Sequence, residues 1–166
     1  TEQRWEEVPK GKESDNDVWR IAIFMSPLDV HVNRVPENSE IVSIEHRAGK
    51  GKRRGPFVAA YRKESEANER VRTVFKTDSG IHIEVTQIAG ALARTIIPWK
   101  GIGDRCRRGE RFGMIRLGSR VDLRIVADEF QPCVIGANSG NKEFPKGEFV
   151  QAGSTILLRQ KNAEEE

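Results

Sequence analysis

The feature that most constrains the fold of this chain is its repeated use of short alternating segments separated by turn residues. The clearest pair is Val71–Thr77 and Ile81–Ile88, which are joined by Asp78-Ser79-Gly80. Alternation of apolar and polar residues with a period of two is typical of a half-buried strand, and a glycine-containing turn between two such runs favours a hairpin. The sequence therefore predicts an antiparallel β-hairpin over these residues.

Comparable segments recur along the chain at short and fairly regular spacing. The predicted strands are 18–24, 40–46, 71–77, 81–88, 96–99, 114–117 and 121–123. Between them, 50–56 has the composition of an exposed loop, and 64–70 is a brief polar connector or helical turn. Because the predicted strands are short and regularly spaced, we expect a mostly β protein, built as a compact β-sandwich or barrel-sandwich-like domain with little helix.

Two further segments share a frame of glycine, acidic residue and glycine. They are Gly103–Gly109 and Gly147–Gly153, and each precedes a segment that we expect to be extended. The frame is similar to the turns of barrel-sandwich folds such as lipoyl domains. Two copies do not make a repeat array, but they favour barrel-like closure.

Composition limits the classes of protein to which the chain can belong. Its 166 residues fit a single domain, 1–166, with a polar segment at 1–17, and 32% of them are charged. The apolar runs are too short to span a bilayer, and the first residues lack the basic and apolar regions of a signal peptide. Because the chain begins at Thr1 without a methionine, we interpret it as a piece of a longer protein.

The net charge is +3, and the basic residues are concentrated at 50–54, 62–63 and 105–111. These clusters lack interleaved aromatic residues and any nucleic-acid-binding motif, so nucleic acid is not expected as a partner. The basic clusters are then either exposed to solvent or in contact with anionic lipid headgroups. Cys106 and Cys133 lie far apart without a CxxC motif, which indicates no metal site and ordinary thiols of a reducing compartment.

The stretch 111–123, RFGMIRLGSRVDL, contains a Gly118-Ser119 pair inside otherwise strand-like sequence. A glycine allows unusual backbone geometry, and the next residue carries a hydroxyl that can reach the glycine carbonyl. The pair therefore fits backbone self-cleavage, although a simple bulge would use the same residues.

Five stretches together resemble the phosphatidylserine decarboxylase family, most closely its short form. They are FGMIRLGSRVD at 112–122, FMSPLDVHVNRVP at 24–36, NER at 68–70, QIAG at 87–90 followed by Ala93-Arg94, and QAGSTIL at 151–157. The resemblance covers about 21–158. It implies a proenzyme that is cleaved between Gly118 and Ser119 into chains 1–118 and 119–166, with Ser119 converted to a pyruvoyl group.

The resemblance also implies the activity. Members are carboxy-lyases that use the pyruvoyl group as an electron sink and convert phosphatidylserine to phosphatidylethanolamine. The expected location is peripheral, on the cytoplasmic face of a membrane. The expected partners are phosphatidylserine in an anionic membrane surface, the two cleavage fragments for each other, and a second copy in a homodimer.

The resemblance assigns roles to a few further residues. His31 is the second catalytic residue beside Ser119, because the family places a histidine there for proton transfer and imidazole titrates near neutrality. Arg70 or Arg94 would bind the lipid phosphate through a bidentate contact, although a structural role is the first interpretation of the trio 68–70. No metal ligand is expected.

Two departures from the family pattern concern self-cleavage. Studied members have a second histidine three residues after the first, and this chain has Arg34 at that position. Studied members also have an aspartate further upstream, and no residue before Val18 in this chain matches it. His31 or Asp29 would have to take over part of this chemistry. The alternatives are a processing-deficient homologue that binds lipid, and a non-catalytic barrel-sandwich binding module. A carrier function is disfavoured because no lysine occupies the usual frame at a hairpin tip.

Overall fold

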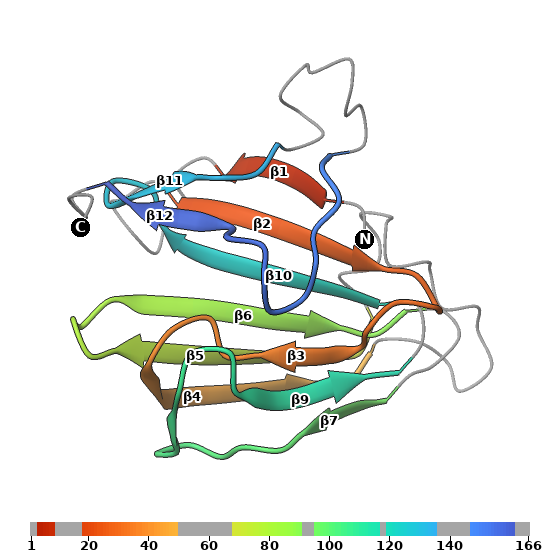
Figure 1. Ribbon diagram of the computed structural model, residues 1–166. Helices are drawn as coiled ribbons and strands as arrows, with labels where there is room; N and C mark the ends of the chain where they lie inside the picture. The colour runs from red at the N-terminus through yellow and green to blue at the C-terminus, as the bar shows by residue number, and fades with distance from the viewer. Residues whose placement is uncertain are drawn as a thin grey trace.

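The computed structural model describes residues 3–8, 18–49, 68–90, 95–116, 119–135 and 147–161 (Figure 1). These ranges contain strands, turns and irregular segments but no helix. The strands are β1 (Gln3–Val8), β2 (Val18–Met25), β3 (Val32–Arg34), β4 (Ser39–Arg47), β5 (Arg70–Thr77), β6 (His82–Ile88), β7 (Ile96–Pro98), β8 (Arg105–Cys106), β9 (Arg111–Ile115), β10 (Ser119–Val126), β11 (Phe130–Pro132) and β12 (Leu158–Gln160). The mostly β fold predicted from the sequence is confirmed.

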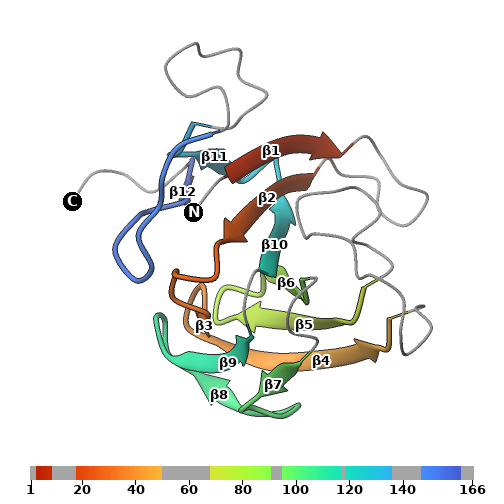
Figure 2. The ribbon, with the colours of Figure 1, turned by 90° about the vertical axis from the view of Figure 1, so that its right-hand side faces the viewer.

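Most strands belong to one antiparallel sheet. Its seven strands follow the order β1-β2-β10-β6-β5-β4-β8, and a smaller sheet has the order β3-β9-β7. The large sheet curls, so that β1 and β4 lie on opposite sides of the molecule, and β9 and β7 lie near β4 (Figure 2). A third pair, β11-β12, brings the end of the described chain next to the segment that follows β10.

The predicted hairpin is present as β5 and β6. The residues that alternate inward on β5 are buried, and Gly80 closes the turn with a φ of 87° and an N–H that donates to the Thr77 carbonyl at 2.9 Å. A positive φ is accessible to glycine without steric cost. Turn chemistry and alternation together therefore set this register.

The core lies between the large sheet and β9. Phe75 on β5 and Phe112 on β9 meet edge to face, with ring centroids 5.2 Å apart and an interplanar angle of 83°. Both rings are almost completely buried. Edge-to-face pairs add about 0.5–1.5 kcal/mol beyond the area that they bury, so this contact joins the two layers firmly.

The two glycine frames are turn-like at their glycines, and the first frame contains strand β8 between them. All four of their terminal glycines, Gly103, Gly109, Gly147 and Gly153, have φ between 78° and 90°. The first frame leads into β9 as expected, whereas the strand after the second frame begins only at Leu158.

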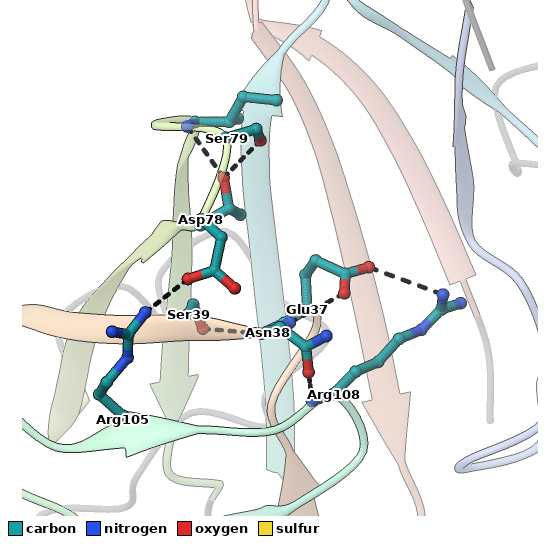
Figure 3. A network of polar contacts seen from close by, with 9 residues as sticks. Glu37, Asn38, Ser39, Asp78, Ser79, Arg105 and Arg108 are labelled. Atoms are coloured by element: carbon teal, nitrogen blue, oxygen red, sulfur yellow. Dashed lines mark hydrogen bonds and ion pairs between the residues drawn. The ribbon is translucent and has the colours of Figure 1, made fainter.

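A surface network holds the connection that leads into β9 (Figure 3). The guanidinium group of Arg105 lies 2.6 Å from Asp78 Oδ1, and that of Arg108 lies 3.6 Å from Glu37 Oε2. The backbone N–H of Arg108 also donates to Asn38 Oδ1 at 2.9 Å. These two basic side chains therefore have acidic neighbours within the chain, which makes the 105–111 cluster less available to an anionic partner.

Some sequence predictions need correction. The polar start contributes a strand, β1, that was not predicted, and it pairs with β2 along its whole length. Ser119 does not interrupt a strand but begins β10. The predicted loop 50–56 and residues 64–67 of the predicted connector lie outside the described residues.

Across the described ranges, no helix is long and apolar enough to cross a lipid bilayer.

Candidate active site

Ser119 begins β10 at one end of the large sheet, where it pairs with Met25, the last residue of β2. Its side chain is 1% exposed, and its Oγ has no hydrogen-bond partner. A buried hydroxyl without a partner is unusual in folded proteins. Gly118, the predicted partner in cleavage, lies outside the described residues.

The connection from β2 to β3 begins at this end of the large sheet, and β9 of the small sheet ends shortly before Ser119. Residues 26–31 lead from β2 to β3, and residues 116–118 separate β9 from β10 (Figure 1). At the small sheet, the N–H of Ile115 donates to the carbonyl of His31 at 3.1 Å. Ser119 begins β10 shortly after Ile115, and Ile115 contacts His31, so Ser119 and His31 lie at the same end of the molecule although they are 88 positions apart (119 − 31).

The ring of His31 is oriented by its own chain. His31 Nδ1 lies 2.7 Å from the backbone oxygen of Asp29. Because a carbonyl oxygen can only accept, Nδ1 carries the hydrogen, and the basic lone pair of the neutral ring is at Nε2. This contact sets both the tautomer and the orientation of the ring.

Asp29 stabilises the turn that precedes His31. Its Oδ2 accepts from the N–H of Ser26 at 2.7 Å, and its own N–H donates to the Ser26 carbonyl at 3.0 Å. Burial alone would raise the pKa of the Asp29 carboxyl group, but the hydrogen bonds from Ser26 outweigh it and lower that pKa. The carboxylate therefore stays ionised at neutral pH.

A buried ionic cluster follows Ser119 directly, on the opposite face of β10. Arg20 Nη2 and Arg120 Nη2 donate to Asp122 Oδ2 at 2.8 and 2.9 Å, and Arg120 Nε lies 2.8 Å from Oδ1. The guanidinium group of Arg120 also lies over the ring of Phe24, 5.7 Å from its centroid. Two cations thus converge on one carboxylate and fix the strand whose first residue is Ser119.

The structure places the other predicted site residues as follows. Arg70 begins β5 at the same end of the large sheet as Ser119, but it shares the outer face with Arg120, because both are in register with Ile88. Arg34, at the position of the missing histidine, donates to the Gly109 carbonyl at 2.7 Å. Arg94 lies outside the described residues.

A cavity of about 1040 Å³ lies on the inner face of the large sheet, between it and residues 150–160. Apolar side chains of β2, β6 and β10 form much of its lining, and the cavity extends to Met25 and Val30. Met25 is the register partner of Ser119, and Val30 precedes His31. The cavity is therefore next to the candidate site.

Sequence reasoning missed one contact at this site. Gln87 on β6 is completely buried, and its Nε2 donates to Asn33 Oδ1 on β3 at 2.7 Å. Both residues belong to stretches that carry the family resemblance, but no pattern in the sequence indicated that they meet. Within the part of the chain that the structure describes, no group of three metal-ligating side chains is present.

Comparison with known proteins decides the family. A family model described as phosphatidylserine decarboxylase matches residues 2–158. The chain belongs to the phosphatidylserine decarboxylase family.

Bacterial and archaeal proteins are among the relatives that are similar to this family member. A "Phosphatidylserine decarboxylase proenzyme" of Thermobifida fusca is 48% identical over 140 residues, which is 84% of this chain and 56% of the relative. One of Streptomyces coelicolor is 54% identical over 104 residues, 63% of this chain and 44% of the relative. A "Putative archaetidylserine decarboxylase proenzyme" of Methanococcoides burtonii is 38% identical over 152 residues, 92% of this chain and 64% of the relative.

The chain thus spans about half the length of the curated relatives it matches, between 44% and 64% in these three cases. No solved structure matches it.

Proposed function

We propose that this chain carries the cleavage site and catalytic residues of a self-processing phosphatidylserine decarboxylase. The observation that carries the proposal is the buried, unpartnered hydroxyl of Ser119 at the start of β10, beside the crossover that bears His31. Family membership supports it, because similar relatives are named as proenzymes. Gly118–Ser119 is the bond that we propose is cleaved.

Cleavage at this bond begins with attack by the Ser119 hydroxyl. Oγ bonds to the Gly118 carbonyl carbon, the C–N bond breaks, and the hydroxyl proton ends on the released nitrogen, which leaves an ester. Loss of the Ser119 α-proton then breaks the Cβ–Oγ bond and frees the Gly118 carboxylate. Water next replaces the remaining nitrogen, which leaves as ammonia, and residue 119 becomes a pyruvoyl group. The first step needs an activated hydroxyl, because an alcohol is a poor nucleophile without a base.

The surroundings of Ser119 fit a pyruvoyl group at this position. The site is buried, it is held on a strand, and no side chain occupies the hydrogen-bonding capacity of Oγ. Such a group supplies a carbonyl that takes up electrons while carbon dioxide leaves. His31 Nε2 then delivers the proton that replaces the carboxylate on the substrate carbon.

The substrate that we propose is a serine phospholipid at a membrane surface. Leu28 and Val30, in the connection that leads to His31, are 97% and 60% exposed, and exposed apolar side chains next to a site favour contact with a lipid surface. The cavity beside Met25 is our candidate for binding the hydrocarbon part of the lipid. Arg70 stays a prediction for the lipid phosphate, but its place on the outer face of the sheet, opposite Ser119, argues against that role. Peripheral attachment on the cytoplasmic face and homodimer formation stay predictions.

The test is an intact-mass spectrum, recorded under denaturing conditions, of this chain and of the full-length protein. We expect two fragments in the full-length protein, the first ending at Gly118 and the second beginning with a blocked residue 119. A Ser119→Ala variant provides the uncleaved control. Decarboxylation of phosphatidylserine in mixed vesicles then tests the activity.

Each outcome has a meaning. Cleavage of only the full-length protein would place a required processing group outside residues 1–166. If the full-length protein shows a single uncleaved mass, the decarboxylase proposal is wrong, and the processing-deficient lipid-binding homologue replaces it.

A further inference from the structure

Two buried polar atoms on neighbouring strands of the large sheet have no hydrogen-bond partner. They are Ser119 Oγ on β10 and Gln87 Oε1 on β6. Ser119 is 1% exposed and Gln87 is 0% exposed, so solvent does not supply the missing bonds. One atom belongs to a hydroxyl, which can donate, and the other belongs to an amide carbonyl, which can only accept. The two groups are chemically complementary.

The register of the sheet places these side chains on the same face. Gln87 is directly opposite Val121, and Ser119 lies two residues before Val121 on the same strand. Residues two apart on a strand point to the same face, so Ser119 and Gln87 are diagonal neighbours. Diagonal neighbours have Cα atoms about 7–8 Å apart, a span that a long side chain such as glutamine bridges.

The amide of Gln87 is held on both sides. Its Nε2 donates to Asn33 Oδ1 on β3 at 2.7 Å, which leaves Oε1 as the atom available to another group. At Gly113 on β9, a Cβ atom would come within 3.1 Å of Gln87 Nε2 and 3.0 Å of the Ile97 carbonyl oxygen. Glycine at position 113 therefore lets β9 pass close to the amide of Gln87. The Gln87 side chain begins on β6 of the large sheet and is held at its end by β3 and β9 of the small sheet.

We propose that Gln87 is a positioning residue for self-cleavage. The two groups are not hydrogen-bonded to each other in this structure; in the reacting proenzyme, a rotation of the Ser119 side chain brings its hydroxyl to Gln87 Oε1, which accepts the hydrogen bond and holds Oγ in the rotamer that attacks the preceding carbonyl. This inference rests on the proposed function. An amide oxygen is too weakly basic to take the hydroxyl proton, so Gln87 does not act as the base. Its contribution is orientation, since a nucleophile that is held in a reactive geometry loses less entropy in the transition state.

The test measures the rate of cleavage in freshly translated full-length protein. The fraction cleaved is followed against time by intact mass at several pH values, for the wild type and for Gln87→Met, which keeps the volume of the side chain and removes the acceptor. Gln131→Ala, at an exposed glutamine on β11, is the matched control. Circular dichroism shows whether each variant is folded.

We expect Gln87→Met to be folded and to cleave at least about tenfold more slowly, whereas Gln131→Ala cleaves at the wild-type rate. A second variant, Gln87→Glu, keeps an acceptor beside the hydroxyl but adds a group that can take its proton. Its rate should rise with pH through the titration of the new carboxyl group, a dependence that a purely structural role of Gln87 would not produce.

The inference is overturned if Gln87→Met cleaves at the wild-type rate. If Gln87→Met does not fold, Gln87→Glu decides: a pH profile identical to that of the wild type rejects the positioning role. Failure of the wild type itself to cleave refutes the proposed function as well, so the two failures are distinguished within one experiment.

Discussion

The ionic cluster behind Ser119 makes a quantitative prediction about stability. In Asp122→Asn, the side chain keeps its shape but loses the charge on which Arg20 and Arg120 converge. The side chains of Arg20, Arg120 and Asp122 are 12%, 6% and 6% exposed, so water screens the two guanidinium groups poorly. Removing one partner of a buried ion pair costs about 3–5 kcal/mol, and we expect the free energy of unfolding to fall by that amount.

The assay is urea denaturation, followed by circular dichroism and supported by thermal melts. Both are made in a Ser119→Ala background, which keeps every sample as one chain. For a domain of this size each kcal/mol corresponds to about 2–4 °C, so the melting temperature should fall by about 6–20 °C. Asp128→Asn is the matched control, because Asp128 is exposed in the turn after β10 and should change stability by less than about 0.5 kcal/mol.

A loss below about 1 kcal/mol in Asp122→Asn would refute the reasoning. It would mean that the aspartate contributes no more than an exposed ion pair does, in spite of its burial. The arginines would then be stabilised by other contacts, and the cluster would not be what fixes β10.

Two further predictions concern side chains outside the site. Lys100 Nζ lies 2.6 Å from Glu110 Oε1, and this hydrogen bond, helped by the backbone N–H of Arg107, lowers the pKa of Glu110. The wild type should therefore have a larger free energy of unfolding than Glu110→Gln above pH 4.5, which is the ordinary pKa of a glutamate. This difference should disappear as the pH falls through the lowered pKa of Glu110, and urea denaturation at several pH values measures it. Burial raises the pKa of the Cys106 thiol, so iodoacetamide at pH 8 should alkylate exposed Cys133 and spare Cys106 in the folded protein; equal labelling in peptide mass spectra would contradict this.

Local patterns in the sequence predicted the parts of the fold that local chemistry determines. The β5–β6 hairpin follows from alternation and an Asp-Ser-Gly turn, and the glycine frames follow from the need for positive φ. β1 was missed because an edge strand can be held by backbone hydrogen bonds to one neighbour, which leaves a weak signature in side-chain patterning. The sequence predicted little helix, and the described residues contain none.

The candidate site was only partly predictable for a different reason. Ser119 and His31 were found through motifs that each lie within a few consecutive residues. Their common location depends on two crossovers between sheets, and the contact of Gln87 with Asn33 joins residues 54 positions apart in different sheets. Long-range pairing of this kind is specified by the topology of the whole domain, and no window of the sequence contains it.

The pairing of β10 also bears on the fate of the protein after the proposed cleavage. From Ser119 to Val126 this strand pairs with β2, and from Arg120 to Arg124 it also pairs with β6. Both neighbours precede residue 118, so the strand that begins the small fragment lies between two strands of the large one. Val121 and Leu123 are buried in the common core, and β10 cannot leave without exposing them. Cleavage before Ser119 would therefore break one covalent bond but leave the pairing of β10 with β2 and β6 intact. The new terminus at residue 119 would remain buried at the end of β10.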